Sequence, residues 1–404
     1  MIEEVPLTRV VEEYGTPCYV YSRAAIEKQW QIYDQAFAGR SHLICYSVKA
    51  NSNLAVLNLL AELGSGFDIV SIGELERVLA ADGKATNIIF SGVGKKRQEM
   101  KRALEVGIKC FNIESPQELH RLNQVAEEMG KIAPIAPRIN PDIDAKTHPY
   151  ISTGLEENKF GIVYRDAIQV YEQANTLKNI DVVGINFHIG SQITSAKPFA
   201  DAIERINTFT EQLQTRNINI QHTDIGGGLG IIYQDETPPK LDDFVKSLCD
   251  VIPESSGEIL LEPGRSIVGN AGVLLTQVEY LKENSKKNFA IVDAAMNDLL
   301  RPTLYDAWHE ILPLKENTKA LSKVYDIVGP ICESSDFVAL DRTIALQQGD
   351  LLAICSAGAY GFCLSSNYNS RPRAAEIMID KYEIHEVRQR ESIDELIAKE
   401  SLIP

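Results

Sequence analysis

The middle of the chain alternates short apolar runs, rich in β-branched residues, with amphipathic stretches. The stretches Gly73–Ala81, Pro116–Met129 and Ala200–Thr215 place apolar residues three and four positions apart, as a helix packed on a sheet requires. The β-like runs are Leu43–Val48, Phe67–Val70, Asn87–Ser91, Cys110–Ile113, Ile135–Ile139, Val183–His188, His222–Ile225 and Glu258–Leu261. Eight such repeats predict an α/β fold with a closed, TIM-like (β/α)8 barrel, and their number disfavours the alternative of an open doubly wound sheet.

The pattern changes after about residue 270, where short β-like runs follow one another with turn residues between them. These runs are Gly272–Tyr280, Phe289–Val292, Lys323–Ile327, Asp350–Ile354, Ala375–Ile379 and Lys381–Glu386. They predict an all-β domain, sandwich-like or barrel-like. Pro17–Tyr21 is also β-like, and we expect it to pair with the C-terminal sheet. The sequence therefore predicts a barrel over residues 25–270 and a discontinuous β domain made of residues 1–24 and 271–404.

Charge and cysteine content narrow the class of protein. The 404 residues include 40 Lys and Arg against 56 Asp and Glu, and the net charge of −16 argues against nucleic acid or an anionic membrane as partners. The 7 cysteines show no metal-ligand spacing, which favours reduced thiols in a cytoplasmic protein. The start, MIEEVPLTRV, has neither secretory nor transit character. No apolar stretch approaches the ~20 residues that a membrane span needs.

Candidate chemistry lies where the first and seventh β-like runs end, and barrel enzymes carry their active sites at the carboxyl ends of the strands. Lys49, in YSVKAN, could lose its proton when buried and attack an aldehyde, although a lone lysine is usually a solvated surface residue. The glycine-rich run Asp224–Gly230 could bring backbone N–H groups to a phosphate, or it could be only a flexible turn.

The sixth and eighth runs end in further polar residues. Glu262 could pair with a protonated ring nitrogen and Arg265 could clamp a carboxylate or phosphate, unless the two form an internal salt bridge. His188 could stack on an aromatic cofactor and Ser191 could donate to a phosphate. The alternative for His188 is a core histidine whose hydrogen bonds are satisfied.

The predicted β domain holds three further groups. Cys332, beside Glu333, could act as a general acid or be a buried structural thiol. Arg301 and Tyr305 lie four residues apart and would share one face if Met296–Trp308 is helical. They could then bind a carboxylate together, or be a surface pair. Tyr360 lies in a turn of small residues.

A lysine, a phosphate cradle, an acid for a ring nitrogen and an arginine at successive strand ends are what pyridoxal 5'-phosphate (PLP) requires. Over nearly the whole chain the sequence resembles the alanine-racemase-like, fold type III family of PLP enzymes, and within it the diaminopimelate decarboxylases. The resemblance rests on YSVKAN, FDIVSIGEL, HPYISTGLEENKFGI, HIGSQ, DIGGGLG, EPGR, MNDLLRPTLYDAWHEI, GPICESSD, AGAYGF and SSNYNSRPRAAE.

This resemblance implies a role for each candidate residue. Lys49 would form the covalent link to PLP with Asp68 near it, His188 would stack on the ring, and Glu262 would pair with the ring nitrogen. Residues implied to hold the phosphate are Ser191, Gly226, Gly227, Gly228, Gly264, Arg265 and Tyr360. Residues implied to bind substrate are Arg265, Arg301, Tyr305, Glu333 and Tyr360. In a head-to-tail homodimer with shared sites, Cys332 as proton donor and Glu333 would come from the partner subunit.

The implied reaction is decarboxylation of meso-2,6-diaminopimelate to L-lysine, the last step of lysine biosynthesis. Ornithine decarboxylases of this family have Asp where this chain has Glu333, and they lack the segment around Arg301. Three alternatives remain open at this stage. They are a decarboxylase of lysine, ornithine, arginine or carboxynorspermidine, an amino-acid racemase, and a PLP-binding protein without catalytic activity.

Overall fold

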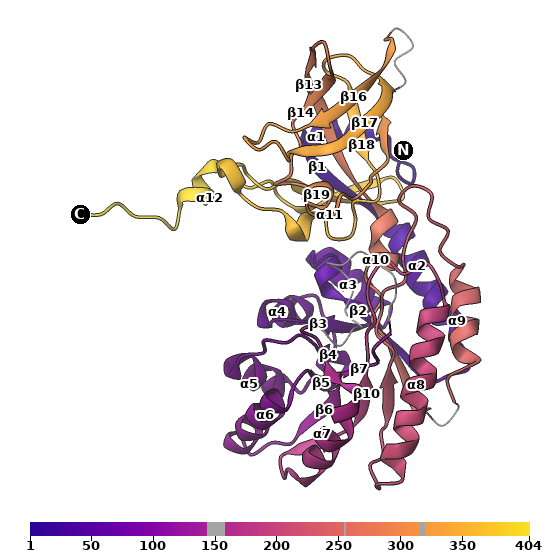
Figure 1. Cartoon of the computed structure of the whole chain (residues 1–404). Coiled ribbons are helices and arrows are strands. Elements are labelled where there is room, and N and C mark those ends of the chain that lie inside the picture. Colours follow the sequence, from indigo (N-terminus) through magenta and orange to yellow (C-terminus); the bar gives the residue numbers. More distant parts are fainter. Residues whose placement is uncertain (144–157, 254–255, 316–319) are drawn as a thin grey trace. The chain divides into compact units, whose positions relative to one another are not determined.

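The computed structural model describes residues 1–143, 158–253, 256–315 and 320–404, and these form two compact units (Figure 1). The barrel unit comprises residues 27–231 and 237–266, and the β unit comprises residues 1–26, 232–236 and 267–404. Most of the segment HPYISTGLEENKFGI falls on residues 148–157, which lie outside the described residues.

The barrel unit is built on a parallel sheet whose order is β10-β11-β12-β2-β3-β4-β5-β6-β9. The predicted run Val183–His188 contains β10 (Gly184–Asn186), whereas β9 (Ile180–Val182) lies just before it and was not predicted. A parallel bridge between Arg138 and Asn186, together with the Val183 N–H donating to the Ile135 carbonyl at 2.9 Å, nearly closes the sheet into the predicted barrel. The strands are β2 (His42–Ser47), β3 (Gly66–Ile69), β4 (Ile88–Phe90), β5 (Cys110–Ile113), β6 (Ala133–Pro137), β9 (Ile180–Val182), β10 (Gly184–Asn186), β11 (His222–Asp224) and β12 (Glu258–Leu261).

Helices cover the outside of this sheet (Figure 1). Their starts are encoded locally, because Ser71 and Ser115 accept hydrogen bonds through Oγ from the backbone of Glu74 and Glu118, each at 3.2 Å. The three predicted helices are present, shifted by a few residues at their ends. The helices are α2 (Arg23–Ala36), α3 (Leu54–Glu62), α4 (Ile72–Ala80), α5 (Arg97–Val106), α6 (Pro116–Glu128), α7 (Tyr164–Thr176), α8 (Lys197–Gln214) and α9 (Leu241–Cys249).

The barrel interior is filled by side chains rather than open. A buried cluster that includes Cys45, Ile89, Cys110 and Leu260 joins strands from around the barrel. The strands are buried almost throughout, as expected for parallel strands that are covered on both faces. Most polar side chains of the barrel therefore lie at the strand ends and in the loops that follow them. One short pair of strands, β7 (Ile139–Asn140) and β8 (Ile162–Val163), lies beyond the end of β6.

The β unit contains a sheet whose main path runs β17-β16-β14-β13-β1-β19-β20. The N-terminal strand β1 pairs antiparallel with β13 and parallel with β19, so it lies between strands from the other end of the sequence. The strands are β1 (Cys18–Ser22), β13 (Gly272–Glu283), β14 (Asn288–Val292), β15 (Ile311–Pro313), β16 (Ser322–Val328), β17 (Phe337–Ala345), β18 (Leu351–Ile354), β19 (Ala375–Asp380) and β20 (Glu383–Arg388).

Sequence patterns missed two strands of this unit and overstated one helix. Strand β15 is short and ends in Pro313, and β17 carries Asp341 and Arg342 in its middle, so neither shows a regular alternation. The stretch Met296–Trp308, for which a helix was one possibility, is helical only over the five residues of α11. The helices of this unit are α1 (Leu7–Tyr14), α10 (Arg265–Val268, which begins at the end of the barrel unit), α11 (Arg301–Tyr305) and α12 (Ile393–Ile397).

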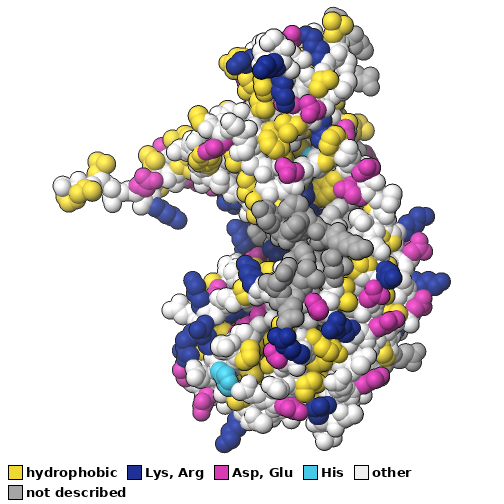
Figure 2. Space-filling model, in the orientation of Figure 1, with side chains coloured by type: hydrophobic (Ala, Val, Ile, Leu, Met, Phe, Trp, Pro, Cys, Tyr) yellow, Lys and Arg dark blue, Asp and Glu magenta, His cyan; other side chains and the backbone are white. Residues whose placement is uncertain are grey.

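Charged side chains of both signs intermingle on the face of the molecule that Figure 2 shows. The net charge of −16 is therefore not gathered into one acidic patch on that face. Across the described ranges, no helix combines the length and the apolar character that crossing a membrane would require.

Candidate active site

Lys49 lies at the carboxyl end of β2, in the short 3-10 helix η1 (Val48–Ala50). Its Nζ donates to Oδ2 of Asp68 at 2.6 Å, and Ser47 Oγ donates to the same oxygen at 3.1 Å. Strand register explains this meeting, because Ser47 and Asp68 are paired residues of neighbouring strands. Asp68 is fully buried whereas the Lys49 side chain is 41% exposed, so the lysine amine lies at the boundary between barrel and solvent. This is not the environment of an ordinary surface lysine.

Three carboxyl groups, Asp68, Asp224 and Glu262, are buried at the ends of β3, β11 and β12. Burial raises the pKa of Glu262 well above its usual value, and the neighbouring Asp224 and Asp68 raise it further. Burial also raises the pKa of Asp224, which shares a hydrogen bond with Glu262. Two neighbouring carboxyl groups in a dry site do not both ionise readily. The pair therefore retains a proton under conditions in which exposed carboxyl groups have lost theirs.

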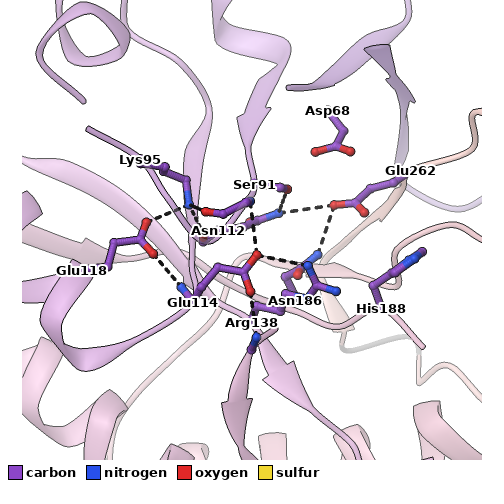
Figure 3. A network of polar contacts seen from close by, with 12 residues as sticks. Asp68, Ser91, Lys95, Asn112, Glu114, Glu118, Arg138, Asn186, His188 and Glu262 are labelled. Carbon is purple, nitrogen blue, oxygen red and sulfur yellow. Dashed lines mark hydrogen bonds and ion pairs between the residues drawn. The ribbon is translucent and has the colours of Figure 1, made fainter. Parts of the chain in front are cut away.

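Two asparagines support Glu262 from within the barrel (Figure 3). The side-chain amides of Asn112 and Asn186 donate to Oε1 of Glu262 at 3.4 and 3.2 Å. Asn112 also lies 3.4 Å from Oδ2 of Asp224 and donates to Ser91 Oγ at 3.0 Å. The sequence reasoning missed both asparagines. The available signal was a single polar residue inside an otherwise apolar strand, as in Cys-Phe-Asn-Ile of β5.

A second polar network joins the ends of β4, β5 and β6 (Figure 3). The buried Lys95 Nζ donates to Glu118 Oε1 at 2.7 Å and to the backbone carbonyl of Asn112 at 2.7 Å. Arg138 pairs with Glu114 at 3.1 Å, and the other oxygen of Glu114 accepts from the Gly161 backbone at 2.7 Å. This network fixes the loops beside the three carboxyl groups and adds a positive charge, Arg138, near them.

The glycine-rich loop after β11 fits its position only because it lacks side chains. A Cβ at Gly227 would lie 2.0 Å from the Glu262 carbonyl oxygen, and one at Gly228 would lie 2.0 Å from the Gly190 carbonyl oxygen. Gly228 also has a φ of +116°, which L side chains rarely adopt. The glycines thus let the turn pack against two carbonyl oxygens of the same unit, and phosphate binding by this loop stays a prediction.

Two amides of this loop are already used inside the barrel unit. The Gly226 N–H donates to Asp224 Oδ1 at 3.0 Å, and the Gly227 N–H donates to His188 Nδ1 at 3.2 Å. Residues other than Gly226 and Gly227 would therefore have to supply most of the hydrogen-bond donors for an anion at this loop. Arg265 and Ser191 meet at the same strand ends, with Arg265 Nη2 donating to Ser191 Oγ at 3.0 Å.

His188 follows β10 and is uncharged in this setting. Burial lowers its pKa well below 6.5, and the charges of Arg138 and Lys49 lower it further. Since Nδ1 accepts from Gly227, the ring hydrogen resides on Nε2. The structure thus presents a neutral imidazole whose orientation is fixed by the glycine loop.

In the β unit, Arg301 lies at the first position of α11 and is buried. Its Nη1 lies 2.8 Å from Nε2 of His309, and its guanidinium carbon lies 4.4 Å from the centre of the Tyr233 ring. Tyr305 is the last residue of the same helix and is half-buried. Arg301 is therefore a braced, buried cation and not half of a surface pair. His309 and Tyr233 were not among the predicted site residues.

Cys332 and Glu333 lie at the exposed tip of a loop. The loop is anchored by buried Asp336, whose carboxylate accepts backbone hydrogen bonds from Met296 at 2.7 Å and Ile331 at 2.6 Å. Glu333 accepts a hydrogen bond from the Tyr368 hydroxyl. The alternative of a buried structural thiol at Cys332 is therefore wrong.

The structure divides the predicted residues into two groups. Those at the strand ends of the barrel unit are Lys49, Asp68, His188, Ser191, Gly226, Gly227, Gly228, Glu262, Gly264 and Arg265. Those of the β unit are Arg301, Tyr305, Cys332, Glu333 and Tyr360, and Tyr360 adopts a φ of +54° in its turn. No group of three or more His, Cys, Asp or Glu side chains suited to a metal ion occurs in the described part of the chain.

Residues 23–269 match the family model described as pyridoxal-dependent decarboxylase, pyridoxal binding domain. The chain is 57% identical over 403 residues to a diaminopimelate decarboxylase of Vibrio cholerae, covering 100% of this chain and 96% of that protein. It is 57% identical over 402 residues to a diaminopimelate decarboxylase of Pseudomonas aeruginosa, covering 100% and 97%. It is also similar to the crystal structure of diaminopimelate decarboxylase from Helicobacter pylori complexed with L-lysine, with a TM-score of 0.94, 42% identity, and coverage of 97% and 98%.

Proposed function

Because the chain belongs to the diaminopimelate decarboxylase family of pyridoxal-dependent decarboxylases, we propose that it decarboxylates meso-2,6-diaminopimelate to L-lysine and carbon dioxide. This is a lyase reaction, it depends on PLP, and it completes lysine biosynthesis. The observation that supports the proposal most directly is the arrangement at the barrel strand ends, where Lys49 contacts Asp68 at 2.6 Å beside the buried Glu262.

The residues at these strand ends fit PLP, which offers an aldehyde, a basic ring nitrogen and a phosphate. Lys49 supplies the amine, and the buried Asp68 has one carboxylate oxygen, Oδ1, without a hydrogen-bond partner within the described chain. Glu262 supplies a buried carboxyl group. Gly227 and Gly228 let the turn pack tightly against the carbonyl oxygens of Glu262 and Gly190, from which a Cβ would be only 2.0 Å away. Lys49 would hold the aldehyde carbon, Glu262 the ring nitrogen, and Ser191, Arg265 and the glycines the phosphate.

PLP, when bound, supplies an electron-poor ring that takes up the electron pair left behind by departing carbon dioxide. The protein must keep that ring electron-poor. Glu262 would do so by keeping the ring nitrogen protonated, and burial raises the pKa of both Glu262 and its neighbour Asp224. Asp68 Oδ2, the contact of Lys49 Nζ, is the base to which the lysine ammonium loses its proton. His188 would cover the ring without adding charge, because burial lowers its pKa well below 6.5.

The β unit supplies the groups for the other end of the substrate. We assign Arg301, with Tyr305 and Arg265, to the distal carboxylate, Glu333 to the distal amine, and Tyr360 to the phosphate and substrate side. A buried arginine that meets no carboxylate is costly, so lysine or ornithine in place of diaminopimelate would bind less well as substrates. Cys332 returns a proton to the carbon that has lost carbon dioxide.

We further propose that the active form is a head-to-tail homodimer with shared sites. Cys332 and Glu333 are exposed at the tip of an anchored loop, which suits residues that serve the site of a partner subunit. We also propose that the enzyme works in the cytoplasm. All seven of its cysteines are free thiols, and a reducing compartment keeps thiols in that form.

Carbon dioxide release tests the proposed reaction. PLP-loaded protein is incubated with meso-diaminopimelate, L-lysine, L-ornithine, L-arginine or carboxynorspermidine, and the amine product is identified. Release from meso-diaminopimelate with formation of L-lysine is expected. Release from one of the other substrates instead would contradict the assignment of Arg301 and Glu333 while leaving the fold and cofactor in place. Racemisation without carbon dioxide would identify a racemase.

A further inference from the structure

His309 is the part of the Arg301 surroundings that no predicted role explains. It is completely buried, and its imidazole lies between two groups of the β unit. Nε2 lies 2.8 Å from Arg301 Nη1, and Nδ1 lies 2.8 Å from the carbonyl oxygen of Cys355. Tyr233 completes the arrangement, with its ring edge-on to the imidazole at 5.4 Å and facing the Arg301 guanidinium at 4.4 Å.

These contacts fix the protonation pattern of His309. A guanidinium has donors only, so Nε2 must accept from Arg301 and carries no hydrogen. A carbonyl oxygen accepts only, so Nδ1 must carry the hydrogen and donate it to Cys355. The imidazole is therefore neutral, in one tautomer. It can hold Arg301 by a hydrogen bond without neutralising its charge.

The backbone around His309 is also held firmly. The His309 carbonyl accepts from Arg342 Nη2 at 3.0 Å, and the Cys355 N–H donates to the Glu310 carbonyl at 2.8 Å. Directly afterwards β15 begins, and it pairs with β18, the strand that ends just before Cys355. A rigid backbone on both sides keeps the imidazole from following movements of the arginine.

We propose that His309 is a positioning residue that fixes the direction of the Arg301 guanidinium, and that it thereby sets the preference of the enzyme for ligands with a distal carboxylate. One contact covers a face of the planar cation and the other occupies one of its edges. Both are needed to orient a group that otherwise rotates about a long, flexible side chain. The inference rests on the proposed role of Arg301 in binding that carboxylate.

Two small ligands isolate this effect. L-lysine, the product, keeps the α-amino carboxylate from the end of diaminopimelate that does not react, whereas 1,5-diaminopentane lacks it. The dissociation constant of each is measured on PLP-loaded holoenzyme by titrating the cofactor absorbance. The ratio of the two constants reports recognition of the distal carboxylate alone, without any turnover.

Two conservative variants separate the two hydrogen bonds of His309. The amide of His309→Gln reaches the position of Nε2 and keeps an acceptor for Arg301. The amide of His309→Asn reaches only the position of Nδ1 and keeps a donor for Cys355. Loss of one hydrogen bond to a charged group weakens binding roughly tenfold, which is the weakening of L-lysine expected for His309→Asn. For the same variant 1,5-diaminopentane binding stays within about twofold, and His309→Gln stays within about threefold of wild type for both ligands.

The opposite order would overturn the proposal. If His309→Asn keeps the preference and His309→Gln loses it, the residue serves only the Cys355 bond and the β15–β18 contact. Loss of preference in a folded His309→Gln protein overturns it even if His309→Asn does not fold. In turnover, His309→Asn should raise KM for meso-diaminopimelate with little change in kcat. The exposed His385→Asn serves as the matched control and should behave as wild type.

Arg301→Met shows whether a failure belongs to the underlying function instead. If wild type does not prefer L-lysine, or if Arg301→Met keeps the preference, then the proposed role of Arg301 is wrong. If Arg301→Met abolishes the preference and both His309 variants keep it, only the role of His309 is wrong.

Discussion

The two units carry their predicted functional residues in opposite ways. In the barrel unit, Asp68, Asp224 and Glu262 are buried at strand ends, and their hydrogen bonds are made within the same unit. In the β unit, Cys332 and Glu333 are exposed at the tip of a loop. A cofactor site that must hold a proton and form a covalent link needs buried side chains whose positions are fixed by hydrogen bonds. Residues that act on a neighbour's substrate must instead protrude. The comparison indicates that the barrel unit holds most of the proposed cofactor residues in contacts made within that unit, whereas the loop of the β unit presents its two residues to solvent.

Replacing Lys49 by Ala tests the residues of the barrel unit, and we expect it to cause the largest loss of activity. Without the amine that contacts Asp68, decarboxylation should fall by at least about 10³-fold. The absorbance of covalently held PLP should also disappear. Turnover and the absorbance spectrum measure both effects, with exposed Lys28→Ala as control. An unchanged spectrum would show that another residue holds the cofactor.

Cys332→Ala tests the loop of the β unit, which we expect to contribute to catalysis only in the dimer. The variant should fold and bind PLP but turn over slowly, since the proton donor is missing. Mixing it with Lys49→Ala should recover up to about a quarter of wild-type activity, because random pairing gives half hybrids and each hybrid has one intact site of two. Activity of the mixture is compared with that of each variant alone. Absence of recovery after verified subunit exchange would refute a shared site.

Glu262→Gln sharpens the comparison by separating function from stability. Glutamine keeps an oxygen for Asn112 and Asn186 but removes a carboxyl group that burial and Asp224 disfavour as an anion. We expect the cofactor-free protein to gain roughly 1–2 kcal/mol in unfolding free energy at neutral pH. The PLP-loaded enzyme should lose most of its activity. Chemical denaturation of both forms measures the difference, and a less stable cofactor-free variant would show that the ionised carboxylate supports the fold.

The smallest expected effect is a change in the pH dependence of stability, which depends on Asp298 in the β unit. Burial raises its pKa from 3.8 to about 7, and Arg371 opposes the shift. The folded state therefore binds the proton more tightly than the unfolded state, and the free energy of unfolding should fall as pH rises from about 4 to 7. Asp298→Asn should flatten this decline by on the order of 1 kcal/mol between pH 5 and 8. Urea unfolding at several pH values checks it, and parallel curves for the two proteins would contradict the shift.

Features encoded by neighbouring residues were predictable from the sequence. The barrel strands show as apolar runs, and Lys49, Glu262 and the glycine loop show by their places directly after such runs. The supporting groups were not predictable, because their partners are far away in the chain. Asn112 and Glu262 are 150 residues apart, and only closure of the barrel brings them together.

Local sequence patterns also failed to predict some contacts between residues that are close in the sequence, because those contacts depend on the fold. Arg301 and His309 are 8 residues apart, yet a short helix and the start of β15 place them together, and neither element follows from a regular pattern. The exposure of Cys332 is a further case. The sequence left open whether this thiol is buried, and only the fold, in which Asp336 anchors the loop, places it in solvent.

The position of β1 has a consequence for synthesis of the chain on the ribosome. Strand β1 is made first, but both of its neighbours, β13 and β19, lie far downstream. At roughly 5–20 residues per second, the 250 positions from Ser22 to Gly272, where the first of these neighbours begins (272 − 22 = 250), take on the order of 10–50 s to translate. During that interval the barrel residues emerge and can fold, whereas β1 stays unpaired with its strand edges open. The nascent chain therefore has a period of exposure to aggregation at its N-terminus that the finished protein does not have.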